Sequence, residues 1–226
     1  MIEHIPIPIF STPWWIGILS AIAVVFLILK LYKRIPAKRQ DVFAKLLGWV
    51  LIVIFVVSNV ISFENGSWNL QDNLPFQICY ISYLIGIVLL FTKKQWMFEW
   101  MYFIGIIGGV YALLTPILTI GNSSWFYFEF YFLHSSIILI PLVLLTGKGM
   151  KIRVDSWWKT MLRLQIPILI LLPLNYILDA NYMFLAEKPI VDNPFLIGEW
   201  PFYLIIIDII TLLHVVVIYK LTPEKI

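Results

Sequence analysis

The sequence predicts an all-α membrane protein, a bundle of seven transmembrane helices. Of its 226 residues, 61% are hydrophobic and only 13% are charged, and the mean hydropathy is +0.91. A water-soluble domain carries about 25% charged residues, so this chain could not cover a surface exposed to water. Its apolar runs are long enough to cross a hydrocarbon core of about 30 Å, which takes roughly 20 helical residues. They lack the alternation of polar and apolar residues that a membrane β-barrel requires.

Seven runs have this length, and charged or turn residues bound each of them. In chain order they cover approximately 13–31, 43–62, 74–92, 96–115, 125–145, 161–178 and 195–219. The first run follows an acidic N-terminus and precedes a dense basic cluster, so we interpret it as a retained anchor and not as a cleaved signal peptide. No internal repeat or low-complexity tract divides the chain, and residues 1–226 are expected to form a single transmembrane domain.

The positions of lysine and arginine predict the orientation, because positively charged connections remain on the cytoplasmic side. Of the 16 basic residues, all except Lys188 lie in the first, third and fifth connections or at the C-terminus. The remaining connections carry the acidic residues Glu3, Glu64, Asp72, Asp179, Glu187, Asp192 and Glu199. The N-terminus is therefore expected outside the cell and the C-terminus in the cytoplasm. Since topology explains the net charge of +3, no nucleic-acid partner is expected.

Polar side chains inside the expected spans are candidate functional residues, because a charge at mid-depth costs on the order of 3 kcal/mol to insert. Asp208 lies near the middle of the seventh span and has no basic neighbour. A hydrogen bond between helices and a functional role both explain such a carboxylate. His134 lies about nine residues into the fifth span, where a single imidazole is more often structural than catalytic.

Cys79 is the single cysteine, so no disulfide can form within the chain. Taken alone it fits a small buried residue. Together with His134 it indicates an activated nucleophile, since both positions fall in the outer half of the membrane and a basic imidazole can deprotonate a thiol. Asn175 and Asp179 are four residues apart, and we expect them on one face of the sixth span, lining the same cavity.

Several short stretches of this sequence occur together in one family. They are Leu74-Pro75-x-x-x-Cys79, Phe132-Leu133-His134, residues 179–185 with Lys188-Pro189, and Trp200-Pro201-x-Tyr203 followed by Asp208. In these stretches the chain resembles the YwaF-like bacterial integral membrane proteins, whose eukaryotic relatives include a transmembrane acyltransferase that remodels ether phospholipids. The resemblance runs from roughly the third span to the end of the chain and is strongest at Asn181-Tyr182-Met183.

The resemblance implies a multi-pass protein of the bacterial cytoplasmic membrane that acts on membrane lipids. It also implies acyl transfer with Cys79 as the acyl carrier and His134 as the base. In that family a histidine is common two residues before the cysteine, where this chain has Gln77, and an amide cannot act as a base. The candidate catalytic residues are Cys79, His134 and Asp208, and the candidate substrate-binding residues are Gln77, Asn175, Asp179, Asn181 and Tyr182.

Two functions are consistent with these residues. In the first, His134 deprotonates Cys79, Asp208 orients His134, and the thiolate attacks a phospholipid or fatty-acyl ester, so the protein is an acyltransferase or an acyl hydrolase. In the second, the protein is a non-enzymatic lipid or small-molecule binder, a carrier, or the membrane subunit of a complex. The sequence contains no metal-ligand pattern, phosphate-binding loop or Gly-x-Ser-x-Gly motif, so neither a cofactor nor a metal is expected.

Overall fold

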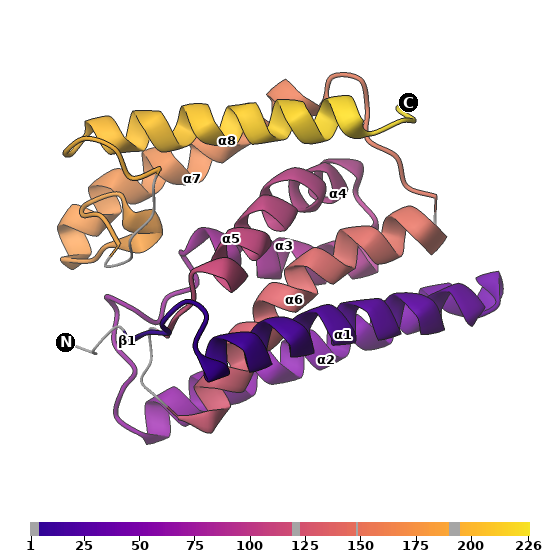
Figure 1. Cartoon of the computed structure of the whole chain (residues 1–226), viewed down its shortest axis with the longest axis horizontal. Helices are drawn as coiled ribbons and strands as arrows, with labels where there is room; N and C mark the ends of the chain where they lie inside the picture. The colour runs from indigo at the N-terminus through magenta and orange to yellow at the C-terminus, as the bar shows by residue number, and fades with distance from the viewer. Residues whose placement is uncertain (1–4, 119–122, 148, 190–194) are drawn as a thin grey trace.

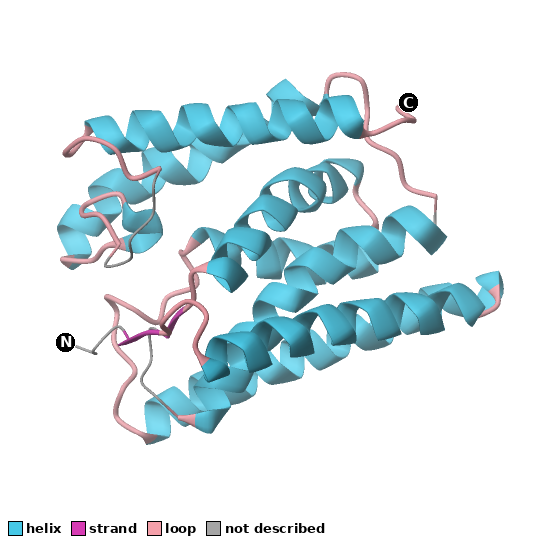
Figure 2. Ribbon diagram, in the orientation of Figure 1, coloured by secondary structure: helices cyan, strands magenta, loops and turns pink. Residues whose placement is uncertain are grey.

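The computed structural model describes residues 5–118, 123–147, 149–189 and 195–226, and it is mostly helical (Figures 1 and 2). Glu3 and Asp192, which belong to the expected charge distribution, lie outside the described residues. The elements in chain order are β1 (Ile5–Pro6), α1 (Thr12–Arg34), α2 (Ala37–Glu64), α3 (Ile78–Thr92), α4 (Gln95–Trp100), η1 (Met101–Gly105), α5 (Ile106–Leu114), β2 (Ile117–Leu118), α6 (Ser124–Gly147), α7 (Ser156–Leu178), η2 (Tyr182–Phe184) and α8 (Phe202–Leu221).

Six helices in the described part of the chain are long and apolar enough to cross a membrane. They are α1, α2, α6, α7, α8 and the continuous helix Gln95–Leu114, in which the π-helical turn η1 joins α4 to α5. Helix α3 is equally apolar but has only 15 residues. The prediction of long apolar helices is confirmed, and the number of crossings stays a prediction. The antiparallel pair β1 and β2 was not expected from the sequence.

Two helices begin later than the sequence indicated. Helix α3 begins at Ile78 and not at Leu74, because Leu74 precedes Pro75 and the residue before a proline avoids the helical region. Residues 74–77 form a turn instead. Helix α8 begins at Phe202 and not at residue 195, because Gly198 has a φ of +82°, which a right-handed helix cannot include.

The helices pack around α3, α6 and the Gln95–Leu114 helix, which supply most of the main hydrophobic core. Helices α1 and α2 lie along one side of this centre, and α7 and α8 form a pair on the other side (Figure 1). The α7–α8 pair meets the centre through α4 and η1. Gly109 brings α5 close to α6, since a Cβ at this position would lie only 2.8 Å from Cγ1 of Ile138 and 3.2 Å from the carbonyl oxygen of His134.

The exterior of the bundle is apolar. On α8, the side chains of Ile205, Ile209, Leu213 and Val217 follow one another at intervals of four residues, and each is more than half exposed. Residues at this spacing share one helix face. A water-soluble protein rarely exposes apolar surface of this extent, so this stripe is the face that α8 presents to lipid.

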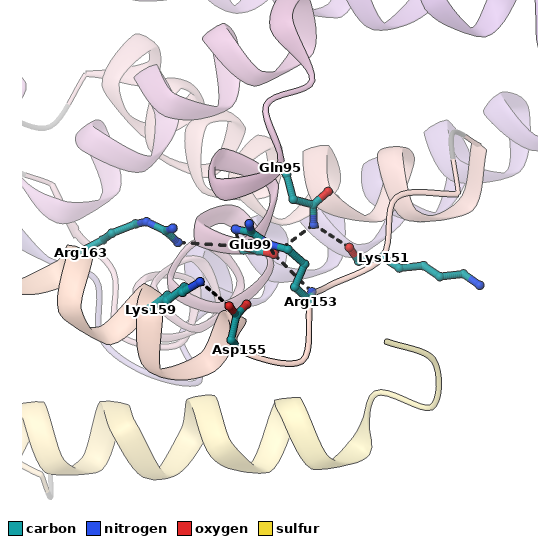
Figure 3. Close-up of polar contacts among 7 residues, drawn as sticks. All are labelled: Gln95, Glu99, Lys151, Arg153, Asp155, Lys159 and Arg163. Atoms are coloured by element: carbon teal, nitrogen blue, oxygen red, sulfur yellow. Dashed lines mark hydrogen bonds and ion pairs between the residues drawn. The ribbon is translucent and has the colours of Figure 1, made fainter. Parts of the chain in front are cut away.

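A buried carboxylate attaches the connection between α6 and α7 to helix α4 (Figure 3). Glu99 has no exposed surface, and its two oxygens accept hydrogen bonds of 2.8 Å from Nε and Nη2 of Arg153. Such bidentate pairs are the strongest class of hydrogen-bonded ion pair. The bonds from Glu99 raise the pKa of the Arg153 guanidinium.

Two more side chains complete this cluster. The amide of Gln95 donates to Glu99 over 3.1 Å and to the carbonyl oxygen of Lys151 over 2.7 Å. Arg163 of α7 places Nη1 at 3.7 Å from Glu99. One carboxylate therefore holds α4, the segment that leads into α7, and α7 itself in a fixed relation.

Candidate functional site

A large cavity lies between the α7–α8 pair and the helices α3, α5 and α6. Its volume is about 640 Å³, and apolar side chains form most of its lining. Asp208, Thr211 and His214 line it from α8. Because these residues are spaced by three, they share the helix face opposite the exposed stripe. The spacing of residues along α8 thus gives the helix a cavity-facing side and an exposed side, which meet at Ile205, an exposed residue that also lines the cavity.

Cys79 lines this cavity from the first turn of α3. Its thiol is free, and its side chain is partly exposed. The sulfur faces α5, where the absence of a side chain on Gly108 leaves room: a Cβ there would lie 3.8 Å from Sγ. The thiol therefore stands at the wall of a mainly apolar space.

His134 lines the same cavity from α6 and is only 7% exposed. Its Nδ1 lies 2.7 Å from the carbonyl oxygen of Phe130, one turn earlier in the helix. A carbonyl oxygen can only accept, so Nδ1 carries the proton and Nε2 of the neutral ring has the free lone pair. Nε2 makes no hydrogen bond with the residues that the structure describes. The backbone thus holds His134 in the tautomer that can take a proton from a group in the cavity.

Asp208 also lines the cavity, but its partner is Gln165 of α7. Nε2 of Gln165 donates to Oδ1 of Asp208 over 3.1 Å, which joins α7 to α8. The expected contact of Asp208 with His134 is not formed. The nitrogen that an orienting carboxylate would bind, Nδ1 of His134, already donates to the backbone of its own helix.

A carboxylate and a second imidazole also line the cavity, and neither was identified from the sequence. Glu129 of α6 is 7% exposed and accepts a hydrogen bond of 2.9 Å from the hydroxyl of Tyr80. His214 of α8 lies 2.9 Å from the hydroxyl of Tyr111 on α5. Both carried a signal in the sequence. Glu129 is a carboxylate inside one apolar run, and His214 is an imidazole inside another.

Comparison with models of protein families supports this architecture. The model of the TMEM164 family, which comprises transmembrane proteins, matches residues 9–219 and thus nearly the whole chain. The chain belongs to the TMEM164 family. Comparisons with curated proteins and with solved structures find no match. This TMEM164 family protein is a multi-pass membrane protein whose apolar helices surround the cavity.

In this TMEM164 family protein, Gln77 is the one expected substrate-binding residue that lines the cavity. Its Oε1 accepts from the N–H of Met183 over 2.8 Å, and its Nε2 lies 3.5 Å from the carbonyl oxygen of Asn181. Gln77 therefore connects the start of α3 to the segment between α7 and α8. Its amide is engaged by the backbone of that segment.

The other expected substrate-binding residues build the same segment and do not line the cavity. Asn175 is buried. Its Nδ2 donates to the carbonyl oxygen of Tyr182 over 2.9 Å, and its Oδ1 accepts from the N–H of Tyr182 over 2.8 Å. The amide of Asn181 bonds to the backbone of Ala186 and Glu187. These side chains fold the segment, because their amide groups are engaged by its backbone.

Tyr182 and Asp179 also differ from the expectation. The hydroxyl of Tyr182 donates to the carbonyl oxygen of Leu70 over 2.7 Å and accepts from the N–H of Leu74 over 3.0 Å. Burial raises the pKa of Tyr182 to about 12, so this hydroxyl stays protonated and keeps donating. Asp179 is exposed and ends α7 with a φ of +50°, so it does not share a helix face with Asn175.

The described side chains form no metal centre. In the part of the chain that the structure covers, no three His, Cys, Asp or Glu side chains gather closely enough to hold a metal ion. Nδ1 of His214 lies 2.7 Å from the carbonyl oxygen of Ile210, and its Nε2 is hydrogen-bonded to the hydroxyl of Tyr111. Of the two histidines that line the cavity in this TMEM164 family protein, His134 is thus the one with an available nitrogen.

Proposed function

We propose that this TMEM164 family protein is a membrane-embedded acyltransferase in which Cys79 carries the acyl group and His134 is the base. The observation that carries the proposal is that both side chains line one mainly apolar cavity, from α3 and from α6. An apolar lining suits an acyl chain. A thiol and an imidazole nitrogen with a free lone pair are the groups that nucleophilic acyl transfer requires. The resemblance to YwaF-like proteins supports phospholipids or fatty-acyl esters in the bacterial cytoplasmic membrane as the substrates.

The first half-reaction loads the acyl group onto Cys79. Nε2 of His134 takes the thiol proton, and the thiolate attacks the carbonyl carbon of the ester. A C–S bond forms, the C–O bond of the ester breaks, and the imidazolium of His134 gives the proton to the departing oxygen. The products are a thioester at Cys79 and a lysophospholipid or alcohol. In the second half-reaction an alcohol receives the acyl group, whereas transfer to water would make the protein a hydrolase.

The apolar lining of the cavity also favours a second candidate, a lipid carrier without chemistry. In a carrier, Cys79 would be a packing residue and would form no covalent adduct with lipid. The two candidates therefore differ in the chemical state of one sulfur atom.

Incubation of the purified protein with defined phospholipids in lipid nanodiscs tests the proposal. We expect mass spectrometry to detect lysophospholipid, a transferred acyl chain, and an acyl adduct on the peptide that contains Cys79. Hydroxylamine should remove this adduct because it cleaves thioesters. The Cys79→Ala variant controls for labelling elsewhere. Lipid that binds but stays chemically unchanged, with no adduct on Cys79, would favour the carrier.

We further propose seven crossings, with the N-terminus outside and the C-terminus in the cytoplasm. At 1.5 Å per residue, α3 extends about 22 Å, which is less than the hydrocarbon core. Non-helical backbone is tolerated at membrane depth where protein covers it. The turn before α3 is covered in this way, since Gln77 and Leu74 bond to the segment between α7 and α8. This arrangement supports α3 as a crossing, and in the proposed orientation Cys79 belongs to the outer half of the membrane.

Single cysteines in a Cys79→Ala background test the orientation. The side chains of Lys38, Lys94, Glu64 and Glu187 are all exposed, so reactivity reports the side of the membrane. In intact cells we expect Lys38→Cys and Lys94→Cys to be protected from an impermeant thiol reagent, and Glu64→Cys and Glu187→Cys to react. Permeabilised cells, in which all four should react, are the control. The opposite pattern of protection would reverse the orientation and move the site to the inner leaflet.

A further inference from the structure

Glu129 is a buried carboxylate that the acylation of Cys79 does not use. It lies on α6, five residues before His134, and only 7% of it is exposed. A charge inside the membrane costs on the order of 3 kcal/mol on the insertion scale, so an intramembrane carboxylate indicates a function by default. Glu129 lines the same cavity as Cys79 and His134.

The one hydrogen bond that the described structure gives Glu129 engages only one of its two oxygens. Oε1 accepts from the hydroxyl of Tyr80, which follows Cys79 in α3, over 2.9 Å. The bond thereby joins the segment that carries the thiol to the helix that carries His134. Oε2 makes no hydrogen bond with the residues that the structure describes. One acceptor oxygen is thus held in place, next to the Cys79 segment, without a donor from the described protein.

The side chains that line the cavity do not provide the missing donor. Among the described lining residues there is no lysine or arginine. The amide of Gln165 donates to Asp208 and to the backbone, and Thr211 donates to its own helix. The hydroxyl of Tyr111 is engaged with His214. Oε2 of Glu129 is therefore available to a hydrogen-bond donor that enters the cavity.

We propose that Glu129 binds the hydroxyl group of the acyl acceptor and acts as its base in the second half-reaction. This inference rests on the proposed function, because it needs an acyl group on Cys79. An ionised carboxylate only accepts hydrogen bonds, so it selects a donor such as the free hydroxyl of a lysophospholipid. The acceptor is thus a lipid alcohol, and the site for its hydroxyl lies between Tyr80 and the thioester.

The second half-reaction needs only the acyl-enzyme and the acceptor alcohol. The hydroxyl oxygen of the acceptor attacks the thioester carbonyl carbon, a C–O bond forms, and the C–S bond breaks. The hydroxyl proton passes to the carboxylate of Glu129 and then to the thiolate of Cys79. Both groups return to their starting states, and the product is a new ester. His134 is thus the base for the thiol of Cys79, and Glu129 is the base for the hydroxyl of the acyl acceptor.

The half-reactions, measured separately, test this assignment in the Glu129→Gln variant. The amide keeps the volume of the side chain and an oxygen for Tyr80, but it cannot take a proton. With a diacyl phospholipid that carries a labelled acyl chain, we expect acylation of Cys79 within a few-fold of the wild-type rate. After addition of a lysophospholipid, we expect transfer to fall by about 100-fold or more, the usual loss when a general base is removed. Acyl-enzyme should therefore accumulate.

Two matched variants strengthen the test. Asp208→Asn changes the other cavity carboxylate, whose Oδ1 already accepts from Gln165, and it should not cause acyl-enzyme to accumulate. Tyr80→Phe removes the hydroxyl that holds Oε1 but leaves the carboxylate. It should raise the KM for the lysophospholipid while acylation stays near wild type, and it provides the test if Glu129→Gln does not fold.

The outcomes separate this inference from the proposed function. Normal transfer to lysophospholipid by Glu129→Gln would overturn the inference and leave Cys79 as the acyl carrier. Equal slowing of both half-reactions, together with a lower melting temperature, would show that Glu129 is structural and would also overturn it. Failure of the wild-type protein to form any adduct on Cys79 would instead remove the proposed function, and the inference with it.

Discussion

Replacement of Cys79 by serine is expected to lower acyl transfer by about 10³-fold or more while the protein keeps its fold. The hydroxyl is close to the thiol in size and polarity, and it is a far weaker nucleophile at neutral pH. The measurement is the rate of acyl transfer between defined phospholipids, beside the melting temperature of the purified variant. If Cys79 only fills space in the core, its replacement by serine should change neither the rate of acyl transfer nor the melting temperature by much. Full transfer by Cys79→Ser on every lipid tested would exclude the thioester mechanism.

The partner of Cys79 provides the control for this result. His134→Gln removes the base and keeps the capacity for hydrogen bonds, so it should lose transfer to a similar extent. The double variant should be about as inactive as either single variant, because residues that act in one step give non-additive losses. Additive losses would show that the two side chains do not share a step. The transfer rate of the double variant, divided by that of each single variant, is therefore as informative as the size of each loss.

Replacement of Glu99 by glutamine is expected to cost about 2 kcal/mol of stability, the usual contribution of a hydrogen bond to a charged group. The amide cannot neutralise Arg153 and Arg163, whose side chains are 35% and 27% exposed, and its one oxygen cannot replace both of the oxygens that accept from Arg153. The loss comes from the charge-assisted hydrogen bonds that the carboxylate makes, since solvent reaches both arginine side chains and stabilises the charges that remain. Thermal or denaturant unfolding in detergent micelles measures the effect.

Glu224→Gln is the matched control for Glu99→Gln. The carboxylate of Glu224 pairs with Lys151 at the surface, where 70% of its side chain is exposed. Solvent and salt screen exposed ion pairs, so this change should have little effect on stability. Equal effects of the two substitutions would mean that the cluster around Glu99 does not hold α4 to the segment before α7.

Much of the fold follows from the sequence because lipid restricts the possible structures. A membrane leaves no water for unpaired backbone groups, so each long apolar run becomes a helix. The starts of α3 and α8 were less predictable. The sequence around Pro75 and Gly198 is apolar enough to belong to the spans. The backbone at these two positions, however, does not form a helix, so the helices begin after them.

The sequence also determined that Cys79 and His134 are unusual, since polar groups are rare in apolar spans. It did not determine the partners of the polar residues. Asp208 bonds to Gln165 and not to His134, and Asn175 bonds to the backbone of Tyr182. Spacing along one helix shows which residues share a face, but it does not show which neighbour that face meets.

Tertiary structure alone decided which apolar faces meet lipid and which surround the cavity. In water, burial of apolar surface distinguishes the inside of a protein from its outside. In a bilayer, lipid tails are as apolar as leucine, so composition does not mark the packed face of a helix. The exposed stripe of α8 and the cavity-facing side with Asp208 and His214 are therefore separated by how α8 is rotated against its neighbours. For the same reason Glu129 could be placed beside Tyr80 only once α3 and α6 were packed together, because that contact joins residues 49 positions apart.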